Sequence, residues 1–128
     1  MEKQSLSAYI KVGKNEIHTS LEVYFFKEDD VMIAYCPALD ISAYGDTVEE
    51  SKKEFTSILF EHLEWCIKHD TLKDDLIKHG WKINAHSYAA PLATDMLIGN
   101  DTFRDIINHR DYQRVFLPQM FNRQYAQA

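Results

Sequence analysis

The sequence predicts an α+β fold, a small antiparallel sheet of three to four strands with a long helix packed on one face. A C-terminal helical segment and a final strand are expected to follow. Short apolar runs separated by turn residues fill the first 45 positions, and one long amphipathic pattern comes directly after them. The chain has 128 residues, of which 45% are hydrophobic, which is enough for one core. We therefore expect a single domain over residues 1–128.

The first predicted strands are residues 7–12 (SAYIKV) and 17–27 (IHTSLEVYFFK), which are rich in β-branched and aromatic side chains. Gly13 and Asn15 supply a turn between them, so the two runs are expected to form a hairpin. In residues 31–36 (VMIAYC), the side chains directed to each of the two faces are apolar, which indicates a central strand covered on at least one face.

Pro37 cannot donate to a strand ladder, so the strand should end there, and ISAY at 41–44 should resume the sheet until Gly45. Asp46 or Thr47 can then cap a helix, with acidic residues in its first turn. The helix is expected to run from Val48 to about His69. Its apolar residues recur at helical spacing and would lie on the sheet: Phe55, Leu59, Leu63 and Cys66.

The remaining elements are shorter. LKDDLIKH predicts a second helix that ends at Gly80, whose position suits a left-handed C-cap. Further helices are expected at about 92–98 and from Asp101 or Thr102 to Asn108, and YQRVFL (112–117) predicts a last strand.

Charge is unevenly distributed along the chain, which has a formal net charge of −6. Residues 28–77 contain 13 Asp and Glu against 4 Lys, and every Arg comes later: Arg104, Arg110, Arg114 and Arg123. An acidic surface repels nucleic-acid phosphates and attracts basic partners, although acidic helices are also common as solvated faces. The balance argues against nonspecific DNA or RNA binding.

No apolar run is long enough to span a bilayer, and the start MEKQSLSAY lacks the apolar core of a secretory signal. A cytoplasmic location is therefore expected. Cys36 and Cys66 fall in a predicted strand and helix, where we expect buried thiols rather than a disulfide.

The segment AYCPALDISAYGDTVEESKKEF (34–55) resembles the central motif of the HicB-like antitoxin family. The long helix, LKDDLIKHGW and the C-terminal strand resemble stand-alone members. The resemblance covers about residues 17–83 and implies a partial RNase H-like fold. Residues 7–83 would form the HicB-like core, and 84–128 a C-terminal extension.

The resemblance implies a non-enzymatic protein that binds and neutralises a small basic RNA-cleaving toxin, and a homo-oligomer is expected. Acidic residues on the long helix are the candidate contacts: Glu49, Glu50, Glu54, Glu61 and Glu64. This chain has PALDIS where family members commonly have PDLPGC, so partner contacts after Pro37 are expected to differ. The C-terminal third offers no recognition helix, and DNA binding is not predicted.

The residues leave two other functions open. An orphan member of the fold would serve as an oligomeric or RNA-associated module. A divalent-metal nuclease would need converging carboxylates, for which Asp40 and Asp46 are the candidates, although each has a simpler role in a loop or cap. No nucleophile with a partner base is evident, so no catalytic residue and no cofactor are predicted.

Two further groups have both a functional and a structural interpretation. His62, Cys66 and His69 share one side of the helix, yet three ligands in one helix rarely complete a zinc site, and no metal is predicted. The aromatic residues of the strands favour core packing, although an exposed row could mediate dimerisation: Tyr24, Phe25, Phe26 and Tyr35.

Overall fold

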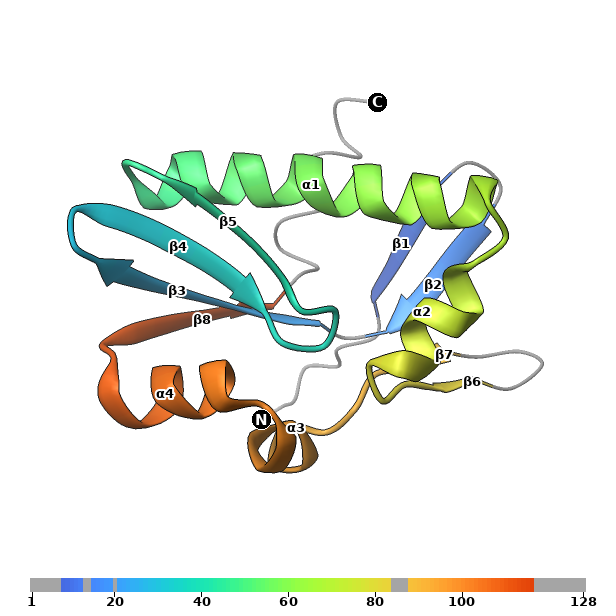
Figure 1. Ribbon diagram of the computed structural model, residues 1–128. Helices are drawn as coiled ribbons and strands as arrows, with labels where there is room; N and C mark the ends of the chain where they lie inside the picture. The colour runs from blue at the N-terminus through green and yellow to red at the C-terminus, as the bar shows by residue number, and fades with distance from the viewer. Residues whose placement is uncertain (1–7, 13–14, 20, 84–87, 117–128) are drawn as a thin grey trace.

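The computed structural model describes residues 8–12, 15–19, 21–83 and 88–116. It confirms the α+β fold, with a four-stranded antiparallel sheet and the long helix α1 (Val48–Lys68) along one face (Figure 1). The strands lie in the order β5-β4-β3-β8, and their bounds are β3 Glu22–Glu28, β4 Val31–Cys36, β5 Ile41–Gly45 and β8 Tyr112–Phe116.

The single strand expected over 17–27 is wrong. The run divides into β2 (Asn15–Thr19), which pairs with β1 (Ala8–Val12) in a separate ribbon, and β3, which joins the main sheet. Leu21 lies between β2 and β3 and is 1% exposed in the core. Both halves have high β propensity, and propensity does not specify which partner each half takes.

The junction between β5 and α1 follows the sequence prediction. The Thr47 hydroxyl oxygen accepts a hydrogen bond from the Glu50 amide at 3.1 Å, and the Glu50 carboxylate accepts one from the Asp46 amide at 2.8 Å. A Cβ on Gly45 would lie 2.7 Å from the Glu50 Cβ, so this close approach requires glycine.

Helices α1 and α2 (Leu72–Lys78) end in the same way. Asp70 takes a left-handed conformation with φ 58°, and the Thr71 amide donates to the Cys66 carbonyl at 2.8 Å. Gly80 has φ 92°, and the Trp81 amide donates to the Leu76 carbonyl at 3.0 Å, which confirms the predicted C-cap. These ends turn α2 back against the C-terminal part of α1.

Each face of the sheet has its own buried cluster. Alternate strand residues such as Val23, Phe25 and Ala34 pack with α1, and the residues between them pack with the C-terminal helices. That second cover consists of α3 (Ala93–Gly99) and α4 (Asp101–His109), which lie on the opposite side of the sheet from α1 (Figure 1).

Packing of α3 and α4 on this face determines the role of the aromatic side chains of the strands. Tyr24, Phe26 and Tyr35 are 2%, 6% and 4% exposed, and they contact Phe103 and Ile106 of α4. Core packing is therefore confirmed, and the exposed row that could have mediated dimerisation is not formed. The sheet is a central layer with helices on both faces.

The C-terminal strand pairs within the chain. β8 lies antiparallel to β3, with Val115 opposite Val23. The helices before it begin near 93 and 101, close to the predicted positions. Two short strands, β6 (Lys82–Ile83) and β7 (Tyr88–Ala89), form a small ribbon that was not predicted. Among the described helices, none is both long enough and apolar enough to cross a membrane.

Candidate functional site

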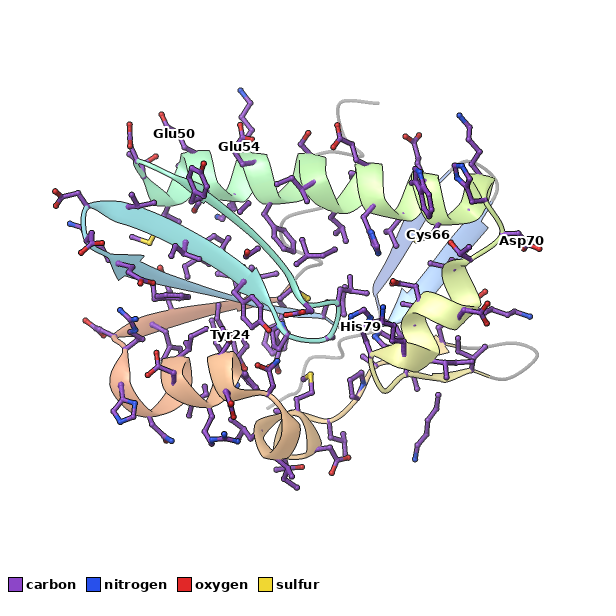
Figure 2. The ribbon with its side chains drawn as sticks, viewed as in Figure 1. Tyr24, Glu50, Glu54, Cys66, Asp70 and His79 are labelled. Atoms are coloured by element: carbon purple, nitrogen blue, oxygen red, sulfur yellow. The ribbon has the colours of Figure 1, made fainter. Side chains whose placement is uncertain are left out.

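All five candidate glutamates are exposed on α1, but two of them have structural roles. Glu49 lies 3.9 Å from the Lys52 ammonium, and Glu50 belongs to the N-terminal cap. Figure 2 shows Glu50 and Glu54 on the side of α1 that faces away from the sheet. Glu54, Glu61 and Glu64 have no ion-pair or hydrogen-bond partner among the described residues.

These three glutamates surround exposed apolar side chains. Ile58 is 36% exposed and Trp65 is 56% exposed, and the two lie seven residues apart, which places them on the same side of the helix. We call this surface the α1 ridge, and its members are Glu54, Ile58, Glu61, Glu64 and Trp65.

Trp65 is held in place by its neighbour one turn later. The His69 ring stacks on the indole with centroids 4.0 Å apart and planes 19° apart. The His69 Nδ1 atom lies 2.9 Å from the Trp65 carbonyl oxygen, which orients the imidazole. An indole fixed in advance loses less side-chain entropy when a partner covers it.

A groove joins the α1 ridge to the edge of the sheet. Its lining includes Tyr44, Gly45 and Asp46 from the β5 end, and Glu54 and Ile58 from the helix. Strand β5 is one of the two outer strands of the described four-stranded sheet, and Tyr44 is 71% exposed. The groove and the ridge therefore form one continuous surface with three large apolar side chains.

The ridge itself carries only negative charge, whereas Lys53 lines the groove beside Glu50 and Glu54. Between Lys53 and Lys68 the helix sequence contains three glutamates and no Lys or Arg. Charged side chains around exposed aromatic and aliphatic groups match the usual anatomy of protein interfaces. Sequence analysis found the glutamates and missed Tyr44, Ile58 and Trp65. The signal was available for the helix, because both residues fall outside the apolar stripe.

The candidate nuclease carboxylates do not converge. Asp40 precedes β5 and Asp46 follows it, so a fully extended strand separates them by about 20 Å. The Asp40 carboxylate accepts a hydrogen bond from the Tyr35 hydroxyl at 2.8 Å, and the Asp46 amide is part of the α1 cap. Neither residue shares a cation-sized space with the other.

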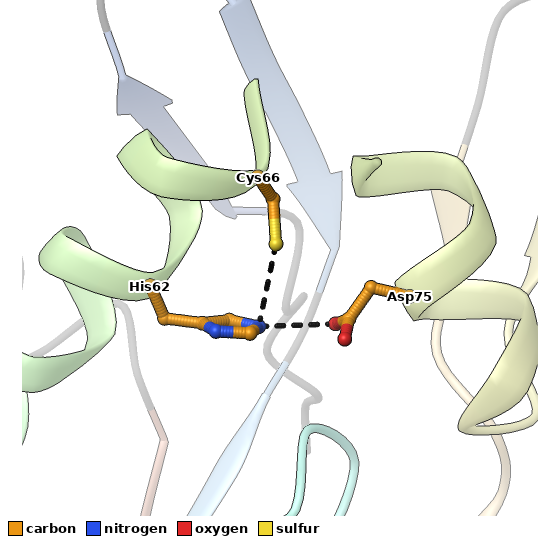
Figure 3. Close-up of side chains that lie close together, drawn as sticks. All are labelled: His62, Cys66 and Asp75. Carbon is orange, nitrogen blue, oxygen red and sulfur yellow. Dashed lines mark hydrogen bonds and ion pairs between the residues drawn. The ribbon is translucent and has the colours of Figure 1, made fainter. Parts of the chain in front are cut away.

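A second group of reactive side chains lies between α1 and α2 (Figure 3). His62 Nε2 is 3.0 Å from an Asp75 carboxylate oxygen and 3.7 Å from the Cys66 sulfur. His69, the third member considered from the sequence, instead stacks on Trp65. Asp75 comes from α2, and no spacing within the helix sequence could have identified it. Among the described residues, this is the set of His, Cys, Asp and Glu ligand atoms close enough to share a metal ion.

Both cysteines are buried free thiols, as the sequence predicts. Burial raises the pKa of the Cys36 thiol to about 12, which excludes it as a nucleophile at neutral pH. Burial also raises the pKa of the Cys66 thiol.

The arginines in the described part of the chain interact with the protein's own carboxylates. Arg104 pairs with Asp101, and Arg114 lies 4.0 Å from Glu22. Arg110 lies 3.6 Å from Glu28 and 3.3 Å from Asp105. Arg123 lies outside the described residues. The guanidinium of Arg110 also lies 5.6 Å from the centre of the Phe26 ring, which is a structural contact at the sheet.

Comparison of the chain with protein-family models, with curated proteins and with solved structures finds no match. The resemblance to the HicB-like family therefore rests on the sequence motifs.

Proposed function

We propose that this protein is a cytoplasmic, non-enzymatic HicB-like antitoxin that binds and neutralises a small basic RNA-cleaving toxin. The observation that carries the proposal is the α1 ridge, where exposed Trp65 and Ile58 lie among Glu54, Glu61 and Glu64. A toxin that binds RNA has Lys and Arg on its RNA-binding surface. An acidic helix is complementary to that surface and competes with RNA for it.

The two kinds of side chain have different parts in this binding. The glutamates would accelerate encounter and select a basic partner, and their contribution would fall as salt screens them. Trp65, Ile58 and Tyr44 would supply the apolar centre, because buried aromatic residues dominate the binding energy of most interfaces. The neighbouring groove would receive a side chain of the partner between β5 and α1.

The test uses the product of a small basic reading frame beside the gene, purified as an inactive variant. Binding is measured by calorimetry at about 50 and 300 mM salt. We expect tight binding that weakens at high salt. Trp65→Ala should weaken it by about thirtyfold, which corresponds to the roughly 2 kcal/mol of an aromatic hot spot. The double reversal Glu54→Lys with Glu61→Lys should weaken it by more than about tenfold.

Asp111→Lys is the matched control, since Asp111 is an exposed acidic residue between α4 and β8 on the other side of the sheet. Asp111→Lys should leave the affinity for the basic protein within about twofold of that of the parent protein. It changes the net charge by the same amount as a reversal at one glutamate, but it lies outside the α1 ridge. Absence of any binding, or equal weakening by Asp111→Lys and by a single reversal at Glu61, would contradict the proposal.

The alternative function is an oligomeric module without a toxin, and the outer edge of β5 favours it. An edge strand with an exposed Tyr44 can pair with β5 of a second copy in an isologous dimer. Light scattering after gel filtration distinguishes the two functions. A stable dimer that Tyr44→Asp dissociates, together with no binding of the basic protein, would favour the oligomeric module.

A further inference from the structure

We propose that His62, Cys66 and Asp75 form a binding site for a divalent transition-metal ion of the zinc class, located where α1 and α2 meet. This inference goes beyond the proposed function and is independent of it, because none of these residues belongs to the α1 ridge. It also replaces the sequence-based expectation of no metal, in which Asp75 was not considered.

The distances fit a shared ion. In a tetrahedral zinc site, metal bonds of about 2.0 to 2.3 Å place ligand atoms about 3.3 to 3.6 Å apart. Here His62 Nε2 is 3.0 Å from the Asp75 oxygen and 3.7 Å from the Cys66 sulfur. All three ligand atoms lie within 4.8 Å of one another. The two distances from His62 Nε2 need shifts of a few tenths of an ångström to match this geometry. The Cys66 sulfur and the Asp75 oxygen, which lie within 4.8 Å, would close the site by rotation of their side chains.

A hydrogen bond from His62 Nε2 serves the two contacts unequally, because a shared N–H donates strongly to a carboxylate and only weakly to sulfur. A neutral imidazole nitrogen either donates or accepts. If His62 Nε2 donates to the Asp75 carboxylate, it cannot also accept from the Cys66 thiol. A cation placed among the three groups interacts with a lone pair of each at once, so it satisfies both contacts of the nitrogen. Figure 3 shows the three side chains directed toward one point from two helices.

The ligand set selects the class of metal. Imidazole, thiolate and carboxylate together suit Zn²⁺ and its neighbours, whereas Mg²⁺ and Ca²⁺ require mainly oxygen ligands. Binding converts the Cys66 thiol to a thiolate and releases its proton to solvent. The side chains of His62 and Asp75 are 31% and 18% exposed, so solvent reaches the group and a water molecule can supply a fourth ligand.

The surrounding residues support the site. His62 and Cys66 are one helical turn apart on α1, and the left-handed Asp70 turn brings Asp75 back to them. The Thr71 hydroxyl donates to the Cys66 carbonyl at 3.5 Å and helps to fix the end of α1 beside the site. His79 Nδ1 lies 2.8 Å from the Asp75 carbonyl oxygen. It also lies 3.8 Å from Asp75 Oδ2, the carboxylate oxygen that His62 contacts. Such neighbours of the ligands orient them and tune affinity.

The experiment titrates the untagged, chelator-treated protein with Co²⁺, which reports its surroundings by absorbance, and then displaces it with Zn²⁺. We expect a thiolate-to-cobalt charge-transfer band and intense visible bands of tetrahedral cobalt at one equivalent. Zn²⁺ should raise the melting temperature, and Mg²⁺ at the same concentration should not. Asp75→Asn and His62→Ala should each weaken Zn²⁺ binding by more than about tenfold.

His69→Ala is the matched control, because it removes a histidine of the same helix that lies outside the site. It should leave Zn²⁺ affinity within about twofold. Cys66→Ser should abolish the charge-transfer band, and Cys36→Ala should leave it unchanged. Asp75→Asn preserves side-chain size, so a result is obtained even if Cys66→Ser does not fold. Equal Zn²⁺ affinity in Asp75→Asn and His69→Ala, or no charge-transfer band, would overturn the proposal.

Discussion

The two faces of the sheet are made by the same strands and are stabilised in different ways. On the α1 face, side chains such as Val23, Phe25 and Leu59 form an almost entirely apolar cluster. On the α4 face, the buried Tyr24 and Tyr35 bring two hydroxyl groups into the cluster. The buried polar groups of the α1 face bond to backbone carbonyls, as the Trp81 indole N–H does to the Ala38 carbonyl at 2.7 Å. The tyrosine hydroxyls of the α4 face bond instead to other side chains.

The polar contacts of the α4 face connect distant parts of the chain. The Tyr35 hydroxyl donates to Asp40 at 2.8 Å and accepts from the Asn100 amide at 2.9 Å. Asn100 also caps α4, because its side-chain oxygen accepts from the Phe103 amide at 2.9 Å. The Tyr24 hydroxyl donates to Glu22 at 2.6 Å. This face therefore determines where α4 begins as well as where it packs.

The largest expected effect compares one phenylalanine from each face. Phe55→Ala on the α1 face and Phe103→Ala on the α4 face remove the same atoms from fully buried positions, so each should lower the free energy of unfolding by about 3 to 5 kcal/mol. We expect the larger loss at Phe55, which lies in the larger cluster. Urea unfolding followed by tryptophan fluorescence measures both.

Ile98→Ala provides the reference, since Ile98 is 79% exposed and should change stability by less than about 0.5 kcal/mol. A loss at Phe103 as small as that at Ile98 would show that the α4 face contributes little to the fold.

The next effect appears at alkaline pH. Burial raises the pKa of both Tyr24 and Tyr35 above the usual value for tyrosine. Below about pH 10 both states keep their phenolic protons, so these groups add no pH dependence there. As pH rises above 10, the unfolded chain loses protons that the folded chain retains. Stability should then fall by up to about 1.4 kcal/mol per pH unit for each phenol.

Tyr24→Phe and Tyr35→Phe should each reduce this slope between pH 10 and 11, measured by urea unfolding at several pH values. Tyr44→Phe, which removes an exposed phenol, is the control. If the slopes of all three variants equal that of the parent protein, the buried phenols do not limit alkaline stability.

The smallest effect compares two left-handed aspartates. Asp70 and Asp40 have φ of 58° and 55°, a conformation that glycine adopts more readily. Asp70→Gly should stabilise the protein by about 0.5 kcal/mol, because relief of strain exceeds the entropy of the added glycine. Asp40→Gly should destabilise it by about 0.5 kcal/mol, since the Tyr35 hydroxyl loses an acceptor worth about 1 kcal/mol.

Thermal unfolding of the two variants measures the sign of each change in stability. Opposite signs would show that polar contacts matter on the α4 face and not at the end of α1. Equal stabilisation by both would mean that the Tyr35 to Asp40 hydrogen bond adds nothing.

The local elements of this fold were predictable because their signals lie close together in the sequence. The cap at Thr47, the left-handed Gly80 and the stripe that includes Phe55 and Leu59 each depend on residues within a few turns. The exposed glutamates were predictable for the same reason, since the buried stripe defines the opposite side of the helix. The division of residues 17–27 into two strands and the β6–β7 ribbon were not predicted, because each depends on pairing between separate segments.

Sequence alone thus determined the class of fold, the order of its main elements and the charge of the long helix, since propensity, capping and periodicity are local properties. Tertiary structure decided which strand β8 joins, what covers Tyr24 and Tyr35, and which residue meets His62 and Cys66. These contacts bring together residues far apart in the chain or across a turn. They depend on how the whole chain closes its loops and buries its apolar surface, and no short sequence window contains that information.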